Sequence, residues 1–133
     1  MYKETLEIET KKGIHIEDIT PKITAIVKKS EISEGMCNIF LQSTTSGLFV
    51  NEFDMMLFED IKKFFKDIVD EKKIYHHPSN ASSHLRAMLL KPEISIPVHE
   101  GELMLGTWQR ILLIEFDVVP RKRNLIVTII EFE

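Results

Sequence analysis

The sequence has little of what marks a secreted or membrane-spanning protein. It contains one cysteine, Cys37, which has no internal partner for a disulfide, whereas secreted chains usually carry an even set. No uninterrupted apolar run approaches the roughly 20 residues that span a bilayer. The first residues are charged and alternating, without the apolar core of a signal peptide. We therefore expect a cytoplasmic protein with no membrane partner.

Basic charge is also scarce. The formal net charge is -4 and the pI is about 5.8. Because a protein that binds phosphate backbones needs a basic face, we expect no nucleic-acid partner. The one dense basic run, Arg121–Arg123, is typical of a solvated turn.

Several standard catalytic motifs are absent. There is no Gly-x-Gly-x-x-Gly, Walker loop, Cys-x-x-Cys or His-Glu-x-x-His, so dinucleotide, P-loop and common zinc sites have no direct support. The Gly-x-Ser-x-Gly elbow of a hydrolase is missing as well. At 133 residues the chain is shorter than the roughly 200 that an eight-fold βα barrel needs.

What is present fits an ordinary globular protein. The apolar fraction is 44% and the charged fraction is 29%, and a chain of this length fits one hydrophobic core. We expect a single domain over residues 1–133.

The N-terminal half predicts strands on either side of a helix. Alternating apolar and polar residues over Thr5–Glu9 predict a strand. A helix is expected from Asp18 to about Lys29, with Thr20 as its N-cap and Pro21 in its first turn. Two further strands are expected at Met36–Gln42 and Leu48–Val50, separated by a small polar loop.

The C-terminal half begins with helices and ends in strands. Apolar residues three and four apart predict an amphipathic helix from Asp54 to about Glu71, with both Phe64 and Phe65 in the core. Ser79 is expected to cap a short helix through Leu90. The remaining expectations are an edge-like strand, a hairpin and a deeply buried last strand, over Ile94–Val98, Leu103–Leu105 with Trp108–Phe116, and Leu125–Phe132. This order favours an α+β fold with mostly antiparallel sheets and two or three helices.

Several segments resemble the YjbQ-like family. The segments that carry the strongest likeness are Leu90–Val98, Gly101–Ile111 with its Leu-Gly-Thr-Trp-Gln run, and Glu115–Asp117. Upstream, Asn80–Leu85 is similar to the family's Asn-Ala-x-x-His-Leu helix start. The family's Tyr-x-His and its strand with polar residues at both ends are matched by Tyr75 with His77, and by Thr44-Thr45 with Val50-Asn51-Glu52. The resemblance covers most of the chain after Gly35.

The resemblance implies a YjbQ-like fold, a homotrimer and an activity. That activity is a secondary thiamine-phosphate synthase, a transferase that joins a pyrimidine pyrophosphate to a thiazole phosphate, so the expected partner is a small phosphorylated molecule. Such a reaction needs cations for phosphate and a preorganised pocket that excludes water. By resemblance the candidate catalytic residues are His77, His84, Glu52 and Gln109, and the candidate substrate-binding residues are Asn51, Thr44, Thr45, Asn80 and Arg121.

Each candidate also has an ordinary structural role open to it. His77 and His84 can bind a divalent metal, Mg or Zn, or shuttle protons, but either can simply cap or pack. Glu52 can stabilise the following helix through its dipole. We expect Trp108 to be buried, which leaves Gln109, on the opposite face of the strand, as the better site residue. Most arginines are exposed, and this is expected of the further candidate cations Arg86 and Arg110.

One departure from the family pattern separates two hypotheses. Where the family has a histidine before the threonine pair, this chain has Ser43, which removes a third imidazole from any metal site. Retained catalysis is one hypothesis, and a non-catalytic trimeric binding or scaffold protein with a vestigial site is the other. Both assume that His77, His84, Glu52 and Gln109 meet in one cavity.

Overall fold

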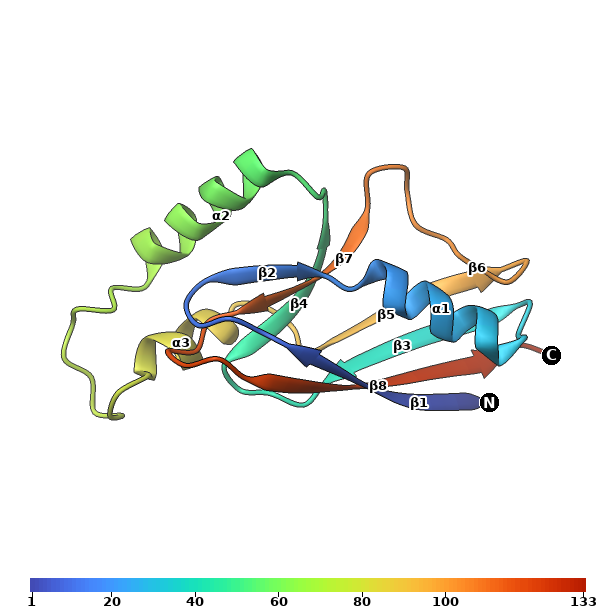
Figure 1. The fold of residues 1–133 in the computed structure, drawn as a ribbon, viewed down its shortest axis with the longest axis horizontal. Helices are drawn as coiled ribbons and strands as arrows, with labels where there is room; N and C mark the ends of the chain where they lie inside the picture. The colour runs from blue at the N-terminus through green and yellow to red at the C-terminus, as the bar shows by residue number, and fades with distance from the viewer.

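Two antiparallel sheets face each other in the computed structural model, which describes residues 1–133 (Figure 1). The five-stranded sheet has the order β1 (Tyr2–Glu9), β8 (Lys122–Glu131), β3 (Gly35–Leu41), β5 (Glu93–His99) and β6 (Glu102–Leu103). The three-stranded sheet has the order β2 (His15–Asp18), β7 (Arg110–Glu115) and β4 (Ser46–Asn51). The helices are α1 (Thr20–Ser30), α2 (Met55–Ile68) and α3 (Ala81–Ala87). The predicted α+β class with mostly antiparallel sheets is confirmed.

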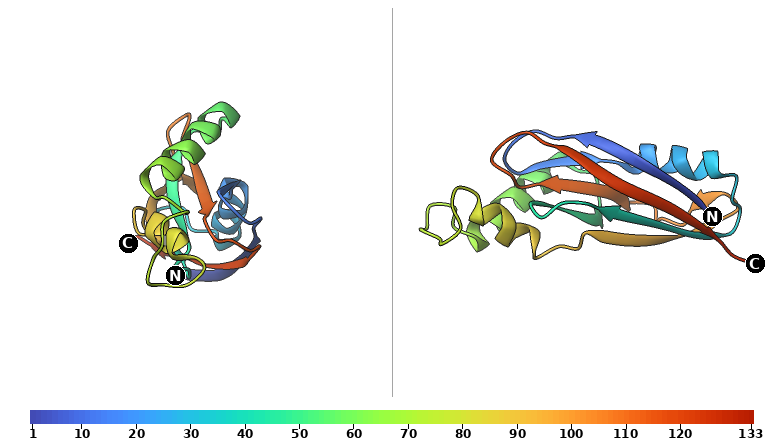
Figure 2. Two further views of the ribbon diagram at one scale, coloured as in Figure 1. Left: turned by 90° about the vertical axis from the view of Figure 1, so that its left-hand side faces the viewer. Right: turned by 90° about the horizontal axis from the view of Figure 1, so that it is seen from below.

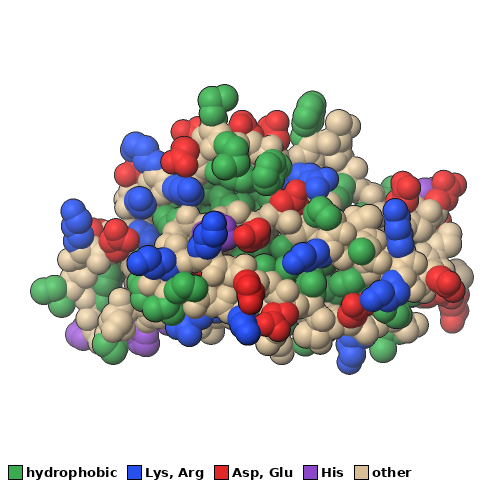
Figure 3. All heavy atoms as spheres, in the orientation of Figure 1, with side chains coloured by type: hydrophobic (Ala, Val, Ile, Leu, Met, Phe, Trp, Pro, Cys, Tyr) green, Lys and Arg blue, Asp and Glu red, His purple; other side chains and the backbone are tan.

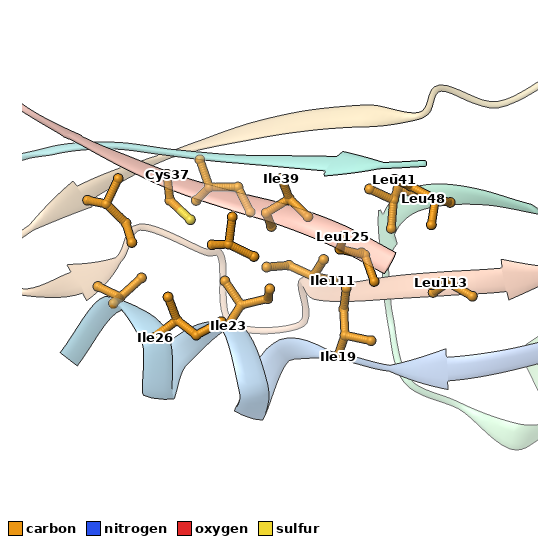
Figure 4. Packing of buried hydrophobic residues seen from close by; sticks show 14 of the residues in the cluster. Ile19, Ile23, Ile26, Cys37, Ile39, Leu41, Leu48, Ile111, Leu113 and Leu125 are labelled. Atoms are coloured by element: carbon orange, nitrogen blue, oxygen red, sulfur yellow. The ribbon is translucent and has the colours of Figure 1, made fainter. Parts of the chain in front are cut away.

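The main core lies between the two sheets and α1. Figure 4 shows Ile23 and Ile26 of α1, Ile39 of β3 and Ile111 of β7 pointing toward one another. The alternation of β3 produces this arrangement, because every second side chain of a strand points to the same face. Each fully buried Ile or Leu contributes about 1.5–3 kcal/mol, so this cluster fixes the position of both sheets.

Strand β7 is buried on both faces. Its residues Ile111 and Leu113 belong to the main core, whereas Ile114 packs with Phe65 and Phe116 in a second, smaller cluster. The predicted hairpin of Leu103–Leu105 with Trp108–Phe116 is therefore wrong: β6 pairs with β5, and β7 pairs with β2 and β4. A strand buried on both faces is apolar throughout, and such a run does not indicate its partners.

The N-cap of helix α1 is one residue earlier than predicted. Ile19 is the N-cap and makes no capping bond through its side chain. Thr20 lies in the helix, where its hydroxyl accepts a hydrogen bond of 2.7 Å from the Ile111 N–H. The predicted N-cap is wrong because the Thr20 oxygen satisfies a backbone group of β7. β2, just before this helix, was not predicted.

Helix α2 extends away from the sheets at one side of the molecule (Figures 1 and 2). Asp54 caps it, accepting a hydrogen bond of 3.1 Å from the Met56 N–H. Phe65 is buried as predicted, but Phe64 is 58% exposed, so the expectation that both lie in the core is half wrong. Only one side of α2 packs on the protein.

Helix α3 is shorter than expected and begins after Asn80, not Ser79. Ser79 has a φ of 70°, in the left-handed region, and makes no cap. The guanidinium of Arg86 is buried and donates to the carbonyls of Phe65 and Val69 at the end of α2. The expected exposure of Arg86 is therefore wrong, because the last carbonyls of a helix need donors.

Two further expectations about side-chain exposure are wrong. Trp108, expected to be buried, is 71% exposed in the loop between β6 and β7. Conversely, Arg123 of the basic run lies in β8 and is buried. None of the three helices has the length and apolar composition needed to cross a bilayer.

Candidate functional site

Three distant segments converge at the start of α3. They are the β3–β4 loop, the end of β7 with the residues after it, and α3 itself. The backbone N–H of Phe116 donates to the carbonyl of Thr45 at 3.0 Å. The hydroxyl of Ser83, which is fully buried, donates to the carbonyl of Phe116 at 2.6 Å. These bonds hold the polar side chains of the three segments together.

His77 and His84 are in contact at this point. Their ring centroids are 4.8 Å apart, and the rings meet edge to face at 81°. His77 is exposed and His84 is half-buried. The expectation that these two imidazoles lie together is confirmed by this geometry, and both rings remain reachable from solvent.

Hollows on both sides of the pair offer room for a ligand. His84 lines a hollow of about 350 Å³ together with Ser43, Thr44 and Ser46. His77 lines a smaller one of about 150 Å³ with Tyr75 and others. Hydroxyl groups and an imidazole around the larger hollow can donate hydrogen bonds to a phosphate.

Asp117 connects the candidate residues of the other segments. Its carboxylate accepts hydrogen bonds from the side chains of Asn80 at 3.2 Å, Thr45 at 3.3 Å and Arg121 at 2.8 Å. Asn80 in turn bonds His77, with 3.1 Å between Oδ1 and Nε2. Four of the predicted site residues thus belong to one hydrogen-bonded network.

The ionisation of Asp117 follows from these partners. Burial alone would raise its pKa, but the Val118 backbone N–H, the Asn80 amide and Arg121 outweigh burial, so the pKa of Asp117 lies below its ordinary value. The group is therefore a carboxylate at neutral pH and a permanent hydrogen-bond acceptor.

A second ion pair, formed by the buried residues Arg123 and Glu115, lies next to Asp117. Arg123 donates from Nε to Glu115 at 2.7 Å and from Nη2 to the Thr45 hydroxyl at 2.7 Å. Thr10 donates to the same Glu115 carboxylate at 2.6 Å. Glu115 is completely inaccessible, and a buried carboxylate is stable only when paired and hydrogen-bonded. The prediction of a solvated turn is therefore wrong for Arg123.

Glu52, Asn51 and Gln109 lie at the far end of β4. In the β4–β7 pairing, Ser46 lies opposite Glu115 and Asn51 lies opposite Arg110, so the two groups are separated by the length of β4, roughly 15–20 Å. The prediction that Glu52 and Gln109 share a cavity with the histidines is wrong within one chain. The prediction failed because polar residues flank β4 at both ends, and the sequence pattern does not show which end lies near the histidines.

The far-end residues make local bonds. The Asn51 side chain accepts from the Glu52 N–H at 2.8 Å, and Gln109 accepts from the Gly106 N–H at 2.7 Å. Arg110 is half-buried and donates to Asp18 at 2.8 Å. Gln109 and Arg110 line a separate hollow of about 280 Å³ beside α1.

No three His, Cys, Asp or Glu side chains converge to hold a metal ion. Next to the His77–His84 pair, the position before the threonine pair is occupied by Ser43. The Ser43 hydroxyl bonds Ser46 at 2.6 Å and accepts from the Thr45 N–H at 3.1 Å. Two imidazoles alone are fewer ligands than a zinc site requires, so the residues present do not form a complete metal site.

Asp117, Glu115 and Arg123 were not predicted as site residues. A signal for Arg123 was present, since residues 123, 125, 127 and 129 share one face of a strand by period two, and the other three are apolar. A signal for Glu115 was also present, because it continues the apolar run of β7. Their pairing with each other depends on the fold.

Comparison with known proteins gives a consistent result. The family model described as UPF0047 protein YjbQ-like matches residues 4–132. A UPF0047 protein of Archaeoglobus fulgidus is 42% identical over 125 residues, covering 92% of this chain and 96% of that protein. A UPF0047 protein of Methanothermobacter thermautotrophicus is 35% identical, covering 97% and 92%.

Solved structures agree with the sequence comparisons. A YbjQ-like protein of unknown function from Sulfolobus solfataricus has a TM-score of 0.93 at 34% identity, covering 98% of this chain and 97% of that one. An uncharacterised YjbQ/UPF0047 protein of Clostridium acetobutylicum has a TM-score of 0.86 at 33% identity, covering 94% and 99%. The resemblance seen in the sequence is confirmed, and the chain belongs to the YjbQ-like (UPF0047) family.

Proposed function

We propose that the protein binds a small phosphorylated molecule in the hollow beside His84 and has a thiamine-phosphate synthase activity. The contact of His77 with His84 beside the hydroxyls of Ser43 and Thr44 carries this proposal. In the reaction, the bond between the pyrimidine methylene carbon and pyrophosphate breaks and a bond to the thiazole nitrogen forms. An imidazolium can donate a proton to the leaving pyrophosphate.

Arg121 does not line the hollow beside His84; we assign it to the phosphate because the network through Asp117 and Asn80 joins it to His77. Its bond to Asp117 uses Nε, and a guanidinium has four further N–H donors on its terminal nitrogens. The side chain is 47% exposed. Asp117 therefore orients Arg121 without exhausting its capacity to bind an anion.

The test is release of pyrophosphate by the purified protein with both thiamine precursors and magnesium. We expect His84→Ala to lower the rate by about a hundredfold or more, the usual scale of a proton-transfer residue. His76→Ala is the matched control, because His76 is an exposed neighbour outside the network, and it should retain the rate. Equal rates for the natural chain and His84→Ala would remove this residue from the mechanism.

We also propose assembly as a homotrimer. Large apolar side chains are exposed on α2 and on the β6–β7 loop, including Met55, Met56, Phe64 and Trp108. Figure 3 shows hydrophobic side chains gathered in the hollowed surface next to α2. Contiguous apolar patches of this kind mark interaction surfaces. Light scattering should give a mass about three times the chain mass of 15.5 kDa.

The alternative is a non-catalytic binding protein with a vestigial site, and Ser43 favours it. The Ser43 hydroxyl accepts hydrogen bonds from the Ser46 hydroxyl and the Thr45 N–H, so it keeps one O–H donor but offers no imidazole nitrogen to a metal. Calorimetry with zinc separates the two functions. Zinc binding by Ser43→His, with none by the natural chain or by the Ser43→Ala control, would indicate a vestigial metal site.

A further inference from the structure

His77, Asn80 and Asp117 form a chain of hydrogen bonds that runs from the surface into the protein. The distances are 3.1 Å from His77 Nε2 to Asn80 Oδ1, and 3.2 Å from Asn80 Nδ2 to Asp117 Oδ1. Asp117 is 1% exposed, Asn80 is half-buried and His77 is exposed. One end of the chain is thus fixed inside the protein, and the other is open to a ligand.

The direction of each bond follows from the buried end. An ionised carboxylate only accepts hydrogen bonds, so the group that Asn80 turns toward Asp117 must be its NH₂. The amide oxygen of Asn80 then faces His77, and because that oxygen is only an acceptor, the Nε2 of His77 must be the donor. The donors that hold Asp117 therefore determine which nitrogen of an exposed imidazole carries a proton.

We infer that Asp117 and Asn80 are positioning residues that, when the His77 ring carries one proton, place that proton on Nε2 and leave Nδ1 as a hydrogen-bond acceptor for the ligand. The ligand class that fits has an N–H or O–H donor close to its phosphate. The inference rests on the proposed function in taking a phosphorylated molecule as the ligand, and it adds the smaller hollow beside His77 to the binding site.

The surroundings of His77 strengthen this selection. His84 packs edge to face against the ring at 4.8 Å between centroids, which restricts the ring rotation that would carry Nε2 away from the Asn80 oxygen. A hydrogen bond of ordinary net strength gives a roughly two- to tenfold preference for the tautomer that makes it. His76, next in sequence but exposed and without a side-chain bond in the network, serves as an internal reference.

The test is nuclear magnetic resonance of protein labelled with ¹⁵N in its histidine rings, at about pH 8.5, where free imidazole is neutral. We expect His77 to show one dominant tautomer with a protonated Nε2 that exchanges slowly with water, and His76 to show a mixture with fast exchange. In Asn80→Ala, the His77 signals should become similar to those of His76. The backbone carbonyl of Asn80 that begins α3 is unchanged in this variant, so α3 should still fold.

A second variant keeps the shape of the network. Asp117→Asn allows the Asn80 amide to face either way, so the tautomer preference at His77 should fall while His84 keeps its own spectrum. A native His77 protonated on Nδ1, or indistinguishable from His76, would overturn the inference. A single Nε2–H tautomer in a protein that releases no pyrophosphate would remove the proposed activity and leave this inference standing.

Discussion

The two ends of β4 carry similar residue types in different surroundings. Before the strand, Thr45 is buried and its hydroxyl bonds both Asp117 and Arg123. At the other end, Asn51, the last residue of the strand, and Glu52 are exposed, and the Asn51 side chain bonds only the adjacent backbone. Polar residues at a strand end therefore form a site only where other segments converge on them, as α3 and the end of β7 do around Thr45.

The apolar surroundings differ in the same way. Near the first end, Phe116 and Ile114 are buried against Phe65, and this cluster continues through Phe49 and Ile61 toward the second end. Near the second end, an apolar groove of about 370 Å³ lies between α2 and β4 and is lined by Phe49, Ile61 and Phe64. The first end thus has its polar network complete within the chain, whereas the second borders an exposed apolar groove.

The largest effect is predicted for a variant that breaks the hydrogen-bonded network at the first end of β4, around Thr45. Glu115→Gln removes the carboxylate in direct contact with the buried Arg123, whose other anionic neighbour, Asp117, lies 4.0 Å from Nη2, and we expect a loss of about 3–5 kcal/mol in the free energy of unfolding. Urea unfolding at neutral pH measures it. The matched control at the other end, Glu52→Gln, should change stability by less than about 0.5 kcal/mol. Similar losses in both variants would show that the two ends do not differ.

The next largest effect concerns how the stability contributed by Asp117, at the first end of β4, depends on acid. Because the folded pKa of Asp117 is lowered, its stabilising contribution is present above the ordinary pKa of about 3.9. That contribution is lost as the pH falls through the lower folded value. Asp117→Asn should cost about 1–3 kcal/mol at neutral pH and make stability fall less steeply with acid. Urea unfolding from neutral pH down to about pH 3 measures both; parallel curves would exclude Asp117 as a source of acid sensitivity.

The smallest effect concerns the exposed end. Trp108→Ala removes a side chain that is 71% exposed, so the free energy of unfolding of the separate chain should change by less than about 0.5 kcal/mol. Unfolding at several protein concentrations checks this. In the proposed homotrimer, where Trp108 belongs to the contact surface, a further loss should depend on protein concentration, because assembly couples stability to concentration. No dependence on concentration would remove Trp108 from that surface.

The sequence predicted most elements and the histidine pair, but not how the ends of β4 differ. Period-two alternation identified β1 and β5, a mostly apolar run identified β3, and helical spacing identified α2, because these patterns are local. Phe64 was assigned to the core from helical spacing and Trp108 from its place in an expected strand, and both are exposed. A pattern reports which face a side chain occupies, but not whether another element covers that face.

What the sequence alone determined is therefore the family, the α+β class and the set of polar residues available to a site. Only the tertiary structure decided which of them meet: Asn80 with Asp117, Thr45 with Arg123 and Arg123 with Glu115, residues separated along the chain by 37, 78 and 8 positions. The physical reason is that side-chain periodicity is local, whereas strand partners and loop contacts depend on how the two sheets bury their shared core.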